Sequence, residues 1–205
     1  MKKLRIYLAD VSSLIGVSFD AYYEKMPKER KEKIDGVKNE KDKLLSLLAG
    51  VLLERIKSEY DKKTDEICVN KNGKPFFKKS DIFFNVSHSG TKVCCAVCDC
   101  QIGCDIQQIG EYKEKTVKRF FLPTEREYIE NSEDKKDAFY RLWTLKESLI
   151  KNLGGKITDK VCPISIENGA IKVPDKTFFE SEIKGYKIAC CLSSEEQIET
   201  SFIYC

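Results

Sequence analysis

Two short apolar runs, each centred on a pair of adjacent cysteines, constrain the fold of this chain more than any other feature. They are residues 93–97, around Cys94 and Cys95, and residues 188–192, around Cys190 and Cys191. Short apolar runs of this kind are typical of buried strands. The two runs occupy equivalent places, late in each half of the sequence. They therefore favour a chain built from two similar units.

The sequence holds ten cysteines and one histidine. Five cysteines lie between residues 94 and 104, with C-x-x-C and C-x-C spacings that also occur in zinc sites. Adjacent strand residues point to opposite faces, so the thiols of a pair would not converge on one ion without a sharp distortion. We expect mostly small, buried, reduced cysteines, with a structural zinc site as the less favoured alternative. A reducing cytosol also argues against disulfides.

The remaining patterns predict an α+β fold in two halves, residues 1–102 and 103–205. Apolar residues at three- and four-residue steps between positions 44 and 56 predict a buried amphipathic helix, preceded by a charged, solvated stretch at 24–43. Strands are expected at 4–9, 82–86 and 92–98 in the first half, and at 102–106, 164–166 and 186–192 in the second. Helices are expected at 113–121, 124–131 and 138–153. Thr124 and Glu127 carry the spacing of a capping box.

Charge and hydropathy exclude several classes of protein. Lys and Arg number 36 against 33 Asp and Glu, and a net charge of +3 is far from the basic footprint of a nucleic-acid binder. Apolar runs are too short for a membrane span or a signal peptide. We therefore expect a cytoplasmic protein that binds neither nucleic acid nor membrane.

Two segments between residues 103 and 151 carry the chemistry. Asp105 and Gln107 share one face of a predicted strand, because side chains alternate along a strand. Trp143, Glu147 and Lys151 follow one stripe of a predicted helix at four-residue steps. Hard oxygen ligands beside ammonium groups suit Mg²⁺ bound to a phosphorylated substrate. An exposed carboxylate at Asp105, and a surface ion pair between Glu147 and Lys151, are the plain structural alternatives.

A third segment, residues 85–90, follows an apolar run and contains His88, the single histidine. A lone loop histidine is often a hydrogen-bonded structural residue. Ser87, His88, Ser89 and the backbone N–H groups of a turn can also form an anion-binding nest. The residues alone leave both a structural histidine and a phosphate-binding turn open here.

These segments resemble, in order and spacing, the Sfp-type 4′-phosphopantetheinyl transferases. The resemblance extends to Gly73-Lys74-Pro75, to residues 118–125 and, less clearly, to the basic stretch after Pro27, so that it spans roughly residues 25–155. It implies a pseudo-twofold arrangement of two similar α+β halves with the active site at their interface. It also implies a monomer that moves the phosphopantetheine arm of coenzyme A to a serine of an apo acyl or peptidyl carrier protein. The products are holo carrier protein and 3′,5′-ADP, as needed in fatty acid, polyketide or nonribosomal peptide synthesis.

The resemblance assigns a Mg²⁺ site to Asp105, Gln107 and Glu147. The second position is usually glutamate in the family, so Gln107 is a departure that removes one charge from the site. Glu147 is also the candidate base for the carrier serine, and Lys151 is an optional general acid.

The resemblance assigns the coenzyme A contacts to a set of mostly basic residues. His88 is expected at the 3′-phosphate, with Ser87 beside it, and Lys146 and Lys151 at the pyrophosphate. The full expected set is Arg30, Lys33, Lys74, Ser87, His88, Lys146 and Lys151. An arginine often found at the start of the first core helix is replaced by Leu45, for which Lys43 is a possible substitute.

Two other functions remain open from the sequence. One is a non-catalytic module that binds coenzyme A or a carrier, which the change at Gln107 makes conceivable. The other is an unrelated Mg²⁺-dependent pyrophosphate hydrolase.

Overall fold

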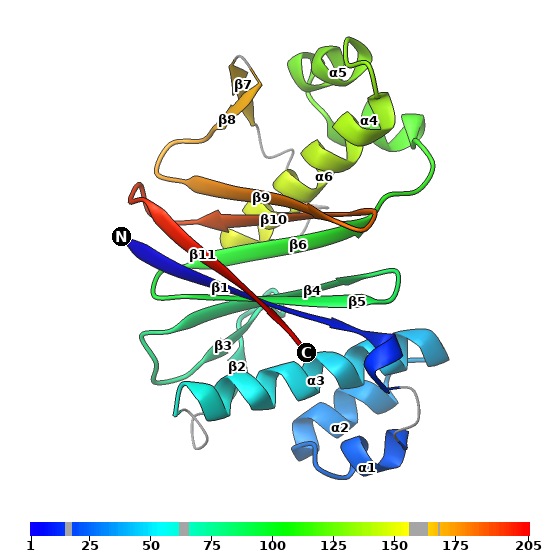
Figure 1. The fold of residues 1–205 in the computed structure, drawn as a ribbon, viewed down its shortest axis with the longest axis vertical. Coiled ribbons are helices and arrows are strands. Elements are labelled where there is room, and N and C mark those ends of the chain that lie inside the picture. Colours follow the sequence, from blue (N-terminus) through cyan, green and yellow to red (C-terminus); the bar gives the residue numbers. More distant parts are fainter. Residues whose placement is uncertain (15–17, 62–65, 156–163, 168) are drawn as a thin grey trace.

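Two β-sheets pack against each other between two long helices (Figure 1). The computed structural model describes residues 1–14, 18–61, 66–155, 164–167 and 169–205. The layers follow the order helix α3, first sheet, second sheet, helix α6. This arrangement confirms the expected α+β class. The pseudo-twofold relation between the halves stays a prediction.

The first sheet has the strand order β11-β1-β5-β4. Its strands are β1 (Lys2–Asp10), β4 (Phe83–Ser89), β5 (Lys92–Cys98) and β11 (Ile198–Tyr204). Helix α3 (Glu40–Glu59) covers its outer face, with Leu45, Leu48, Leu52 and Ile56 against the strands. The helix starts at Asn39, whose side-chain oxygen accepts a hydrogen bond from the Asp42 N–H.

The second sheet has the order β6-β10-β9, with all neighbours antiparallel. Its strands are β6 (Ile102–Gln108), β9 (Thr177–Ile183) and β10 (Tyr186–Leu192). Helix α6 (Lys135–Asn152) lies on its outer face and contacts β6 and β10. At Gly103 on β6, an added Cβ atom would collide with the α6 backbone at Ser148 and Asn152. A glycine at this position is therefore required for the helix to lie so close to the strand.

Shorter elements complete the fold. A 3₁₀ turn η1 (Val11–Leu14) and helices α1 (Phe19–Tyr23) and α2 (Lys28–Asp35) precede α3, and α2 packs on α3 through Met26, Ile34 and Leu47. The others are β2 (Ile67–Val69), β3 (Pro75–Phe77), α4 (Glu114–Phe120), α5 (Pro123–Glu130), β7 (Ser165–Glu167) and β8 (Ala170–Lys172).

The paired cysteines behave as expected. Cys94 and Cys190 point into the layer between the two sheets, whereas Cys95 points toward α3 and Cys191 toward α6. All four are free and buried. The prediction that each pair serves as small packing residues facing opposite layers is confirmed.

The capping-box prediction at Thr124 and Glu127 is wrong. Helix α5 begins at Pro123, with Leu122 as its N-cap, and the Glu125 carboxylate accepts the Leu122 N–H at 2.8 Å. Proline fits the first helical position because its fixed φ suits a helix and it has no N–H to satisfy. The N-cap therefore lies two residues earlier than the Thr124 pattern indicated.

The chain crosses from the first sheet to the second between β5 and β6, at the expected division near residue 102. Strand β11 then returns and pairs in parallel with β1. The second half of the sequence therefore contributes the edge strand of the first sheet. Sequence patterning missed β2, β3, β8, β9 and β11, and the helix expected at 44–56 begins four residues earlier, at Glu40.

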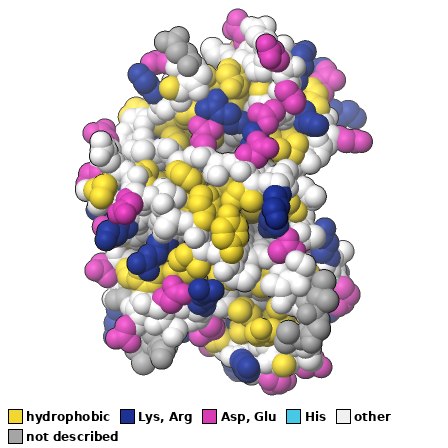
Figure 2. Space-filling model, viewed as in Figure 1, with side chains coloured by type: hydrophobic (Ala, Val, Ile, Leu, Met, Phe, Trp, Pro, Cys, Tyr) yellow, Lys and Arg dark blue, Asp and Glu magenta, His cyan; other side chains and the backbone are white. Residues whose placement is uncertain are grey.

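No helix in the described ranges is both long and apolar enough to span a bilayer. Figure 2 shows acidic and basic side chains interspersed over one face of the molecule, in keeping with the near-balanced charge of the chain.

Candidate active site

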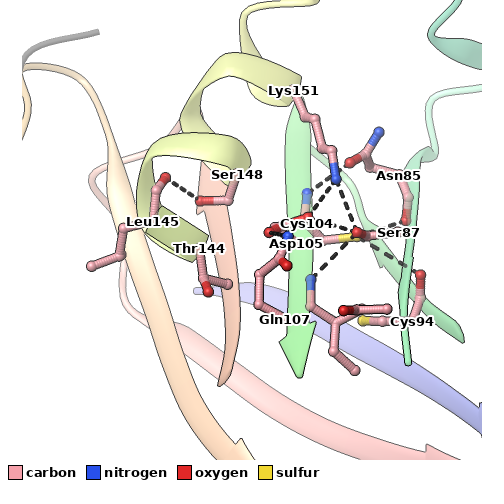
Figure 3. Close-up of polar contacts among 12 residues, drawn as sticks. Asn85, Ser87, Cys94, Cys104, Asp105, Gln107, Thr144, Leu145, Ser148 and Lys151 are labelled. Carbon is pink, nitrogen blue, oxygen red and sulfur yellow. Dashed lines mark hydrogen bonds and ion pairs between the residues drawn. The ribbon is translucent and has the colours of Figure 1, made fainter. Parts of the chain in front are cut away.

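The buried carboxylate of Asp105 is the centre of a polar cluster between β4, β6 and α6 (Figure 3). Asp105 is only 1% exposed. Its Oδ1 accepts hydrogen bonds from Ser87 Oγ and Lys151 Nζ, both at 2.6 Å, and its Oδ2 accepts one from Gln107 Nε2 at 2.9 Å. Gln107 therefore shares a strand face with Asp105, as the alternation predicted.

Helix α6 supplies Glu147 and Lys151 from one stripe, again as predicted. Lys151 projects from the last turn, and its ammonium contacts both Ser87 and Asp105 (Figure 3). Burial opposes the charge on Lys151, but the adjacent Asp105 carboxylate outweighs it, so the pKa of Lys151 is raised. Lys151 therefore stays protonated at neutral pH.

Burial raises the pKa of Glu147, and the negative charge of Asp105 raises it further, while Lys151 partly opposes the shift. One turn earlier on the same stripe, Trp143 packs among the rings of Phe120, Phe121 and Phe139. This aromatic packing holds the middle of α6 in place, and with it the Glu147 backbone.

Lys146 does not lie where the resemblance implied, at the pyrophosphate side of the site. Its ammonium forms a buried ion pair with Glu125, at 2.7 and 2.8 Å from the two carboxylate oxygens, and it does not line the pocket described below. Lys146 is 3% exposed and Glu125 is 0% exposed. Each residue advances an α-helix by about 100°, so a neighbour of Glu147 points to another side. Lys146 thus anchors α6 to α5.

Strand β4 does not form the phosphate-binding turn that the sequence left open. Its backbone pairs with β5 through Ser89, so these N–H groups belong to a sheet. Side-chain oxygens of Asn85, Ser87 and Ser89 instead accept hydrogen bonds from the N–H groups of Cys104, Ile106 and Gln108 on β6. These three side chains, at every second position of β4, link the two sheets, because β4 and β6 belong to different sheets and share no backbone pairing. Ser87 therefore faces Asp105 and Lys151 rather than the pocket.

A cavity of about 760 Å³ lies beside this cluster, between α2, α3 and the β2–β3 loop. Lys151 lines it, and so connects it to Asp105. The expected residues Arg30, Lys33, Lys74 and His88 line it as well. A volume of this size is typical of small-molecule sites.

Arg30 and Lys33 form an incompletely satisfied basic pair at the α2 side of the cavity. Burial lowers the pKa of Arg30, and burial together with the Arg30 charge lowers the pKa of Lys33. Arg30 donates to the Ser46 carbonyl, while its Nε is buried without a hydrogen-bond partner among the described residues. An added Cβ at Gly50 would press on Arg30 Nε, so glycine makes room for this guanidinium on α3.

Lys74 and His88 occupy the other walls. The Lys74 ammonium donates to the carbonyl of Ile102 at 2.7 Å and to that of Asn152 at 3.4 Å, and burial lowers its pKa to about 8. Partial desolvation, and then the charge of Lys151, lower the pKa of His88, which leaves the imidazole largely neutral at pH 7. Among the residues that the structure describes, Arg30, Lys33 and Lys74 form no ion pair with a carboxylate.

Other expected or missed positions are explained by packing. Leu45 is buried in the core under α3, and Lys43 pairs with Glu40 at 2.9 Å rather than lining the cavity. Sequence reasoning missed Asn152, which is fully buried and donates to the carbonyls of Gln101 and Cys191. No local pattern marks this residue, whereas the polar alternation at 85, 87 and 89 could have indicated the seam between sheets.

The oxygen atoms that Asp105 and its neighbours could offer as ligands suit a divalent cation of the Mg²⁺ type. Two carboxylates, Asp105 and Glu147, are close enough to repel each other, and a bound cation would relieve that repulsion. Gln107 carries an amide oxygen as well as the nitrogen that now contacts Asp105, and a rotation of the amide exchanges them. Asp105, Glu147 and Gln107 are therefore the residues that could hold the metal.

Comparison with known proteins gives the family. A family model described as the 4′-phosphopantetheinyl transferase superfamily matches residues 101–200, the stretch that holds β6 and α6. The 4′-phosphopantetheinyl transferase gsp of Aneurinibacillus migulanus is 30% identical, with 84% of this chain and 78% of that protein covered. The 4′-phosphopantetheinyl transferase Sfp of Bacillus subtilis is 32% identical, with 80% of each covered. On these similarities, the chain belongs to the 4′-phosphopantetheinyl transferase superfamily.

Proposed function

We propose that this enzyme transfers the 4′-phosphopantetheine arm of coenzyme A to a serine of an apo acyl or peptidyl carrier protein, releasing 3′,5′-ADP. One observation carries the proposal: the cavity that meets the buried carboxylate of Asp105 at Lys151 is lined by Arg30, Lys33 and Lys74, which form no ion pair with a described carboxylate. Four carboxylates line it as well, and two of them, Glu54 and Glu66, are paired with Lys57 and Lys78. Such a cavity favours a polyanion, and coenzyme A carries three phosphates. The carboxylates of Asp105 and Glu147 would hold the cation that neutralises the pyrophosphate.

Arg30, Lys33 and His88 are proposed to bind the nucleotide phosphate. Their pKa values are lowered in the free protein, so an arriving dianion would recover the electrostatic energy that desolvation costs. Lys74 stands between this region and the start of β6. It is proposed to contact the nucleotide while it holds the ends of β6 and α6 together.

Asp105 and Glu147, with Gln107, are proposed to hold Mg²⁺. When bound, the ion would polarise the pyrophosphate and neutralise charge that develops on the leaving nucleotide. The Lys151 ammonium would contact the same phosphates. Because its pKa is raised, Lys151 supplies positive charge and is a poor proton donor at neutral pH.

Glu147 is the proposed general base for the carrier serine. Burial and Asp105 raise its pKa in the metal-free protein, whereas a bound cation would lower it. The proposed role therefore rests on its place on α6 beside Lys151 and Asp105. The proton would move from the serine hydroxyl to a Glu147 oxygen as the serine oxygen attacks the β-phosphorus. The bond from that phosphorus to the bridging oxygen breaks, and 3′,5′-ADP leaves with the bridging oxygen.

Incubation of the enzyme with coenzyme A, Mg²⁺ and an apo carrier protein tests the proposal by intact-mass spectrometry. A transferase adds the phosphopantetheine arm to the carrier. A non-catalytic binding module gives no product, and a pyrophosphate hydrolase releases nucleotide without a carrier. Either of those two results would contradict the proposal.

Asp105→Asn tests the site itself. We expect a loss of about 100-fold or more in kcat/KM, since the variant keeps the shape of the side chain and removes its charge. Glu199→Gln, on the exposed side of β11, is a matched charge removal away from the cavity and should keep normal turnover. Near-normal activity of Asp105→Asn at limiting Mg²⁺ would show that Asp105 is not a metal ligand.

The natural carrier, the monomeric state and the cytoplasmic location stay predictions.

A further inference from the structure

Three potential metal ligands converge at the crossover between the two sheets, just before β6 in the chain and outside the Asp105 cluster. Residues 98–101 connect β5 in the first sheet to β6 in the second. Cys98 Sγ lies 3.5 Å from Cys100 Sγ and 3.5 Å from Asp99 Oδ1, and the three ligand atoms lie within 4.8 Å of one another. Among the described residues, no other group of three His, Cys, Asp or Glu side chains converges in this way.

Two of the three separations are close to the edges of a tetrahedral zinc site, and the third is at most 4.8 Å. With Zn–S bonds of about 2.3 Å and Zn–O bonds of about 2.1 Å, a tetrahedron has S···S edges of about 3.8 Å and S···O edges of about 3.6 Å. The observed 3.5 Å separations come within a few tenths of an ångström of both values. Small side-chain shifts would therefore suffice to admit an ion.

The surroundings leave these three residues open to solvent on one side and place a cation beside them. Cys98 is 3% exposed, whereas the Asp99 side chain is 58% exposed, so the group is closed on one side and open to solvent on the other. The Lys2 ammonium lies 3.4 Å from Asp99 Oδ2, and it also approaches the Glu196 carboxylate at 3.6 Å. Two thiolates and a carboxylate around a divalent ion leave one negative charge, which Lys2 is placed to offset.

We propose that Cys98, Asp99 and Cys100 form a binding site for a thiophilic divalent cation such as Zn²⁺, with water as the fourth ligand. Each ligating thiol loses its proton to solvent as its sulfur–metal bond forms. Thiolate ligands select zinc over magnesium, so this site differs in chemistry from the oxygen donors at Asp105. Its effect would be structural: the ion would fix the crossover on which β6 depends.

The strand alternation that argues against zinc at Cys94 and Cys95 does not apply to Cys98 and Cys100. Cys98 is the last residue of β5, and Cys100 lies in the turn that follows, where the chain reverses. The turn brings the two sulfurs to the same side. The other close-packed cysteines keep the role expected of them.

Metal titration of the reduced, oxygen-free protein tests the proposal. All proteins carry Cys68, Cys162 and Cys205 replaced by serine, so that less-buried or undescribed thiols do not contribute. Cd²⁺ serves as an ultraviolet probe through its thiolate charge-transfer band, and Zn²⁺ affinity is measured against a chromophoric chelator. We expect one ion per chain, and a rise in Tm on the order of 5 °C at a hundredfold excess of Zn²⁺ over Kd.

Three variants on that background locate the ion. Cys98→Ser combined with Cys100→Ser should abolish the cadmium band, and Asp99→Asn, a surface change that leaves the core intact, should weaken Zn²⁺ binding by about tenfold or more. Asp105→Asn should bind Zn²⁺ as the parent does, whatever happens to transferase activity. The proposal is overturned by a parent protein that binds no ion, by binding that survives the double cysteine change, or by binding lost in Asp105→Asn.

Discussion

At the scale of single residues, Gln107 changes the electrostatics of the proposed metal site. Its amide nitrogen donates to Asp105 Oδ2 at 2.9 Å, an interaction that a second carboxylate could not make. The free protein therefore tolerates a buried aspartate with Lys151 and Gln107 as its neighbours. The same amide offers a metal one neutral oxygen in place of a charged one.

Gln107→Glu should lower the half-saturating Mg²⁺ concentration for transfer, on the order of tenfold, because it adds a full charge at ligand distance. Without Mg²⁺ the same variant should melt at a lower temperature than the parent, since two carboxylates then face each other. Activity titrations against Mg²⁺, and melting curves with and without the ion, measure both effects.

Gln108→Glu is the matched control, because Gln108 is the next residue on β6 and is exposed. It should leave the Mg²⁺ requirement unchanged. An unchanged requirement in Gln107→Glu as well would mean that the side chain does not reach the metal.

We expect Lys74 to make coenzyme A binding sensitive to alkaline pH. Burial lowers its pKa to about 8 in the free protein, below its usual value, so the ammonium is lost as pH rises through that value. A bound polyanion favours the charged form, and binding above pH 8 therefore requires proton uptake. Affinity for coenzyme A should fall by up to about tenfold per pH unit above 8.

Calorimetric titrations between pH 7 and 10 measure this dependence. Lys74→Arg keeps its charge throughout this range, so its affinity should show no inflection near pH 8. If the parent and Lys74→Arg share one pH profile, Lys74 is not the titrating group.

At the scale of elements, the contact between α6 and β6 decides whether the site forms. The helix carries Glu147 and Lys151, the strand carries Asp105, and Gly103 permits their close approach. Asn152 and Lys74 then tie the end of the helix to the start of the strand. A small displacement of α6 would move Glu147 and Lys151 together away from Asp105.

Gly103→Ala should destabilise the protein by about 1–3 kcal/mol or more, because the methyl group meets helix backbone that has no rotamer to change. It should also reduce transfer by more than the lost stability explains, since α6 must move away from Asp105. Denaturant midpoints and kcat/KM on the remaining folded protein separate the two effects.

Gly36→Ala is the control for adding a methyl group. Gly36 ends α2 with φ −68°, and the nearest atoms around an added Cβ lie at ordinary contact distances of 3.5 and 3.7 Å. Stability should be unchanged or slightly increased. A Gly103→Ala protein as stable as Gly36→Ala would contradict the proposed close packing.

At the scale of the whole molecule, the two sheets share one apolar layer. Leu4, Ile6 and Ala96 of the first sheet contact a cluster that includes Ile106 and Ile188 of the second. Strand β11, from the end of the chain, completes the first sheet beside β1. Neither sheet keeps its buried face without the other.

We therefore expect a single cooperative unfolding transition. Trp143, the only tryptophan, reports on α6 through fluorescence, and far-ultraviolet circular dichroism reports on both sheets. The two signals should give one midpoint in denaturant. Two separated midpoints would show that the halves unfold independently.

Local sequence predicted much of the secondary structure because the signals are local. Apolar spacing defined the middle of α3, and short apolar runs defined β5 and β10. Strands β9 and β11 were missed because their polar and apolar residues mix, with only partial burial on one side. Their place in a sheet depends on neighbours that are distant in the sequence, as with β1 for β11.

The sequence by itself determined which side chains share a face: Asp105 with Gln107 on a strand, and Glu147 with Lys151 on a helix. Periodicity is a property of the backbone and needs no partner. Only the tertiary structure decided that Lys151 reaches Asp105, that Lys146 turns to Glu125, and that Ser87 faces β6. These outcomes depend on how two sheets and a helix pack, because a side chain's partner across an interface is set by the distance between elements and not by its neighbours in the chain.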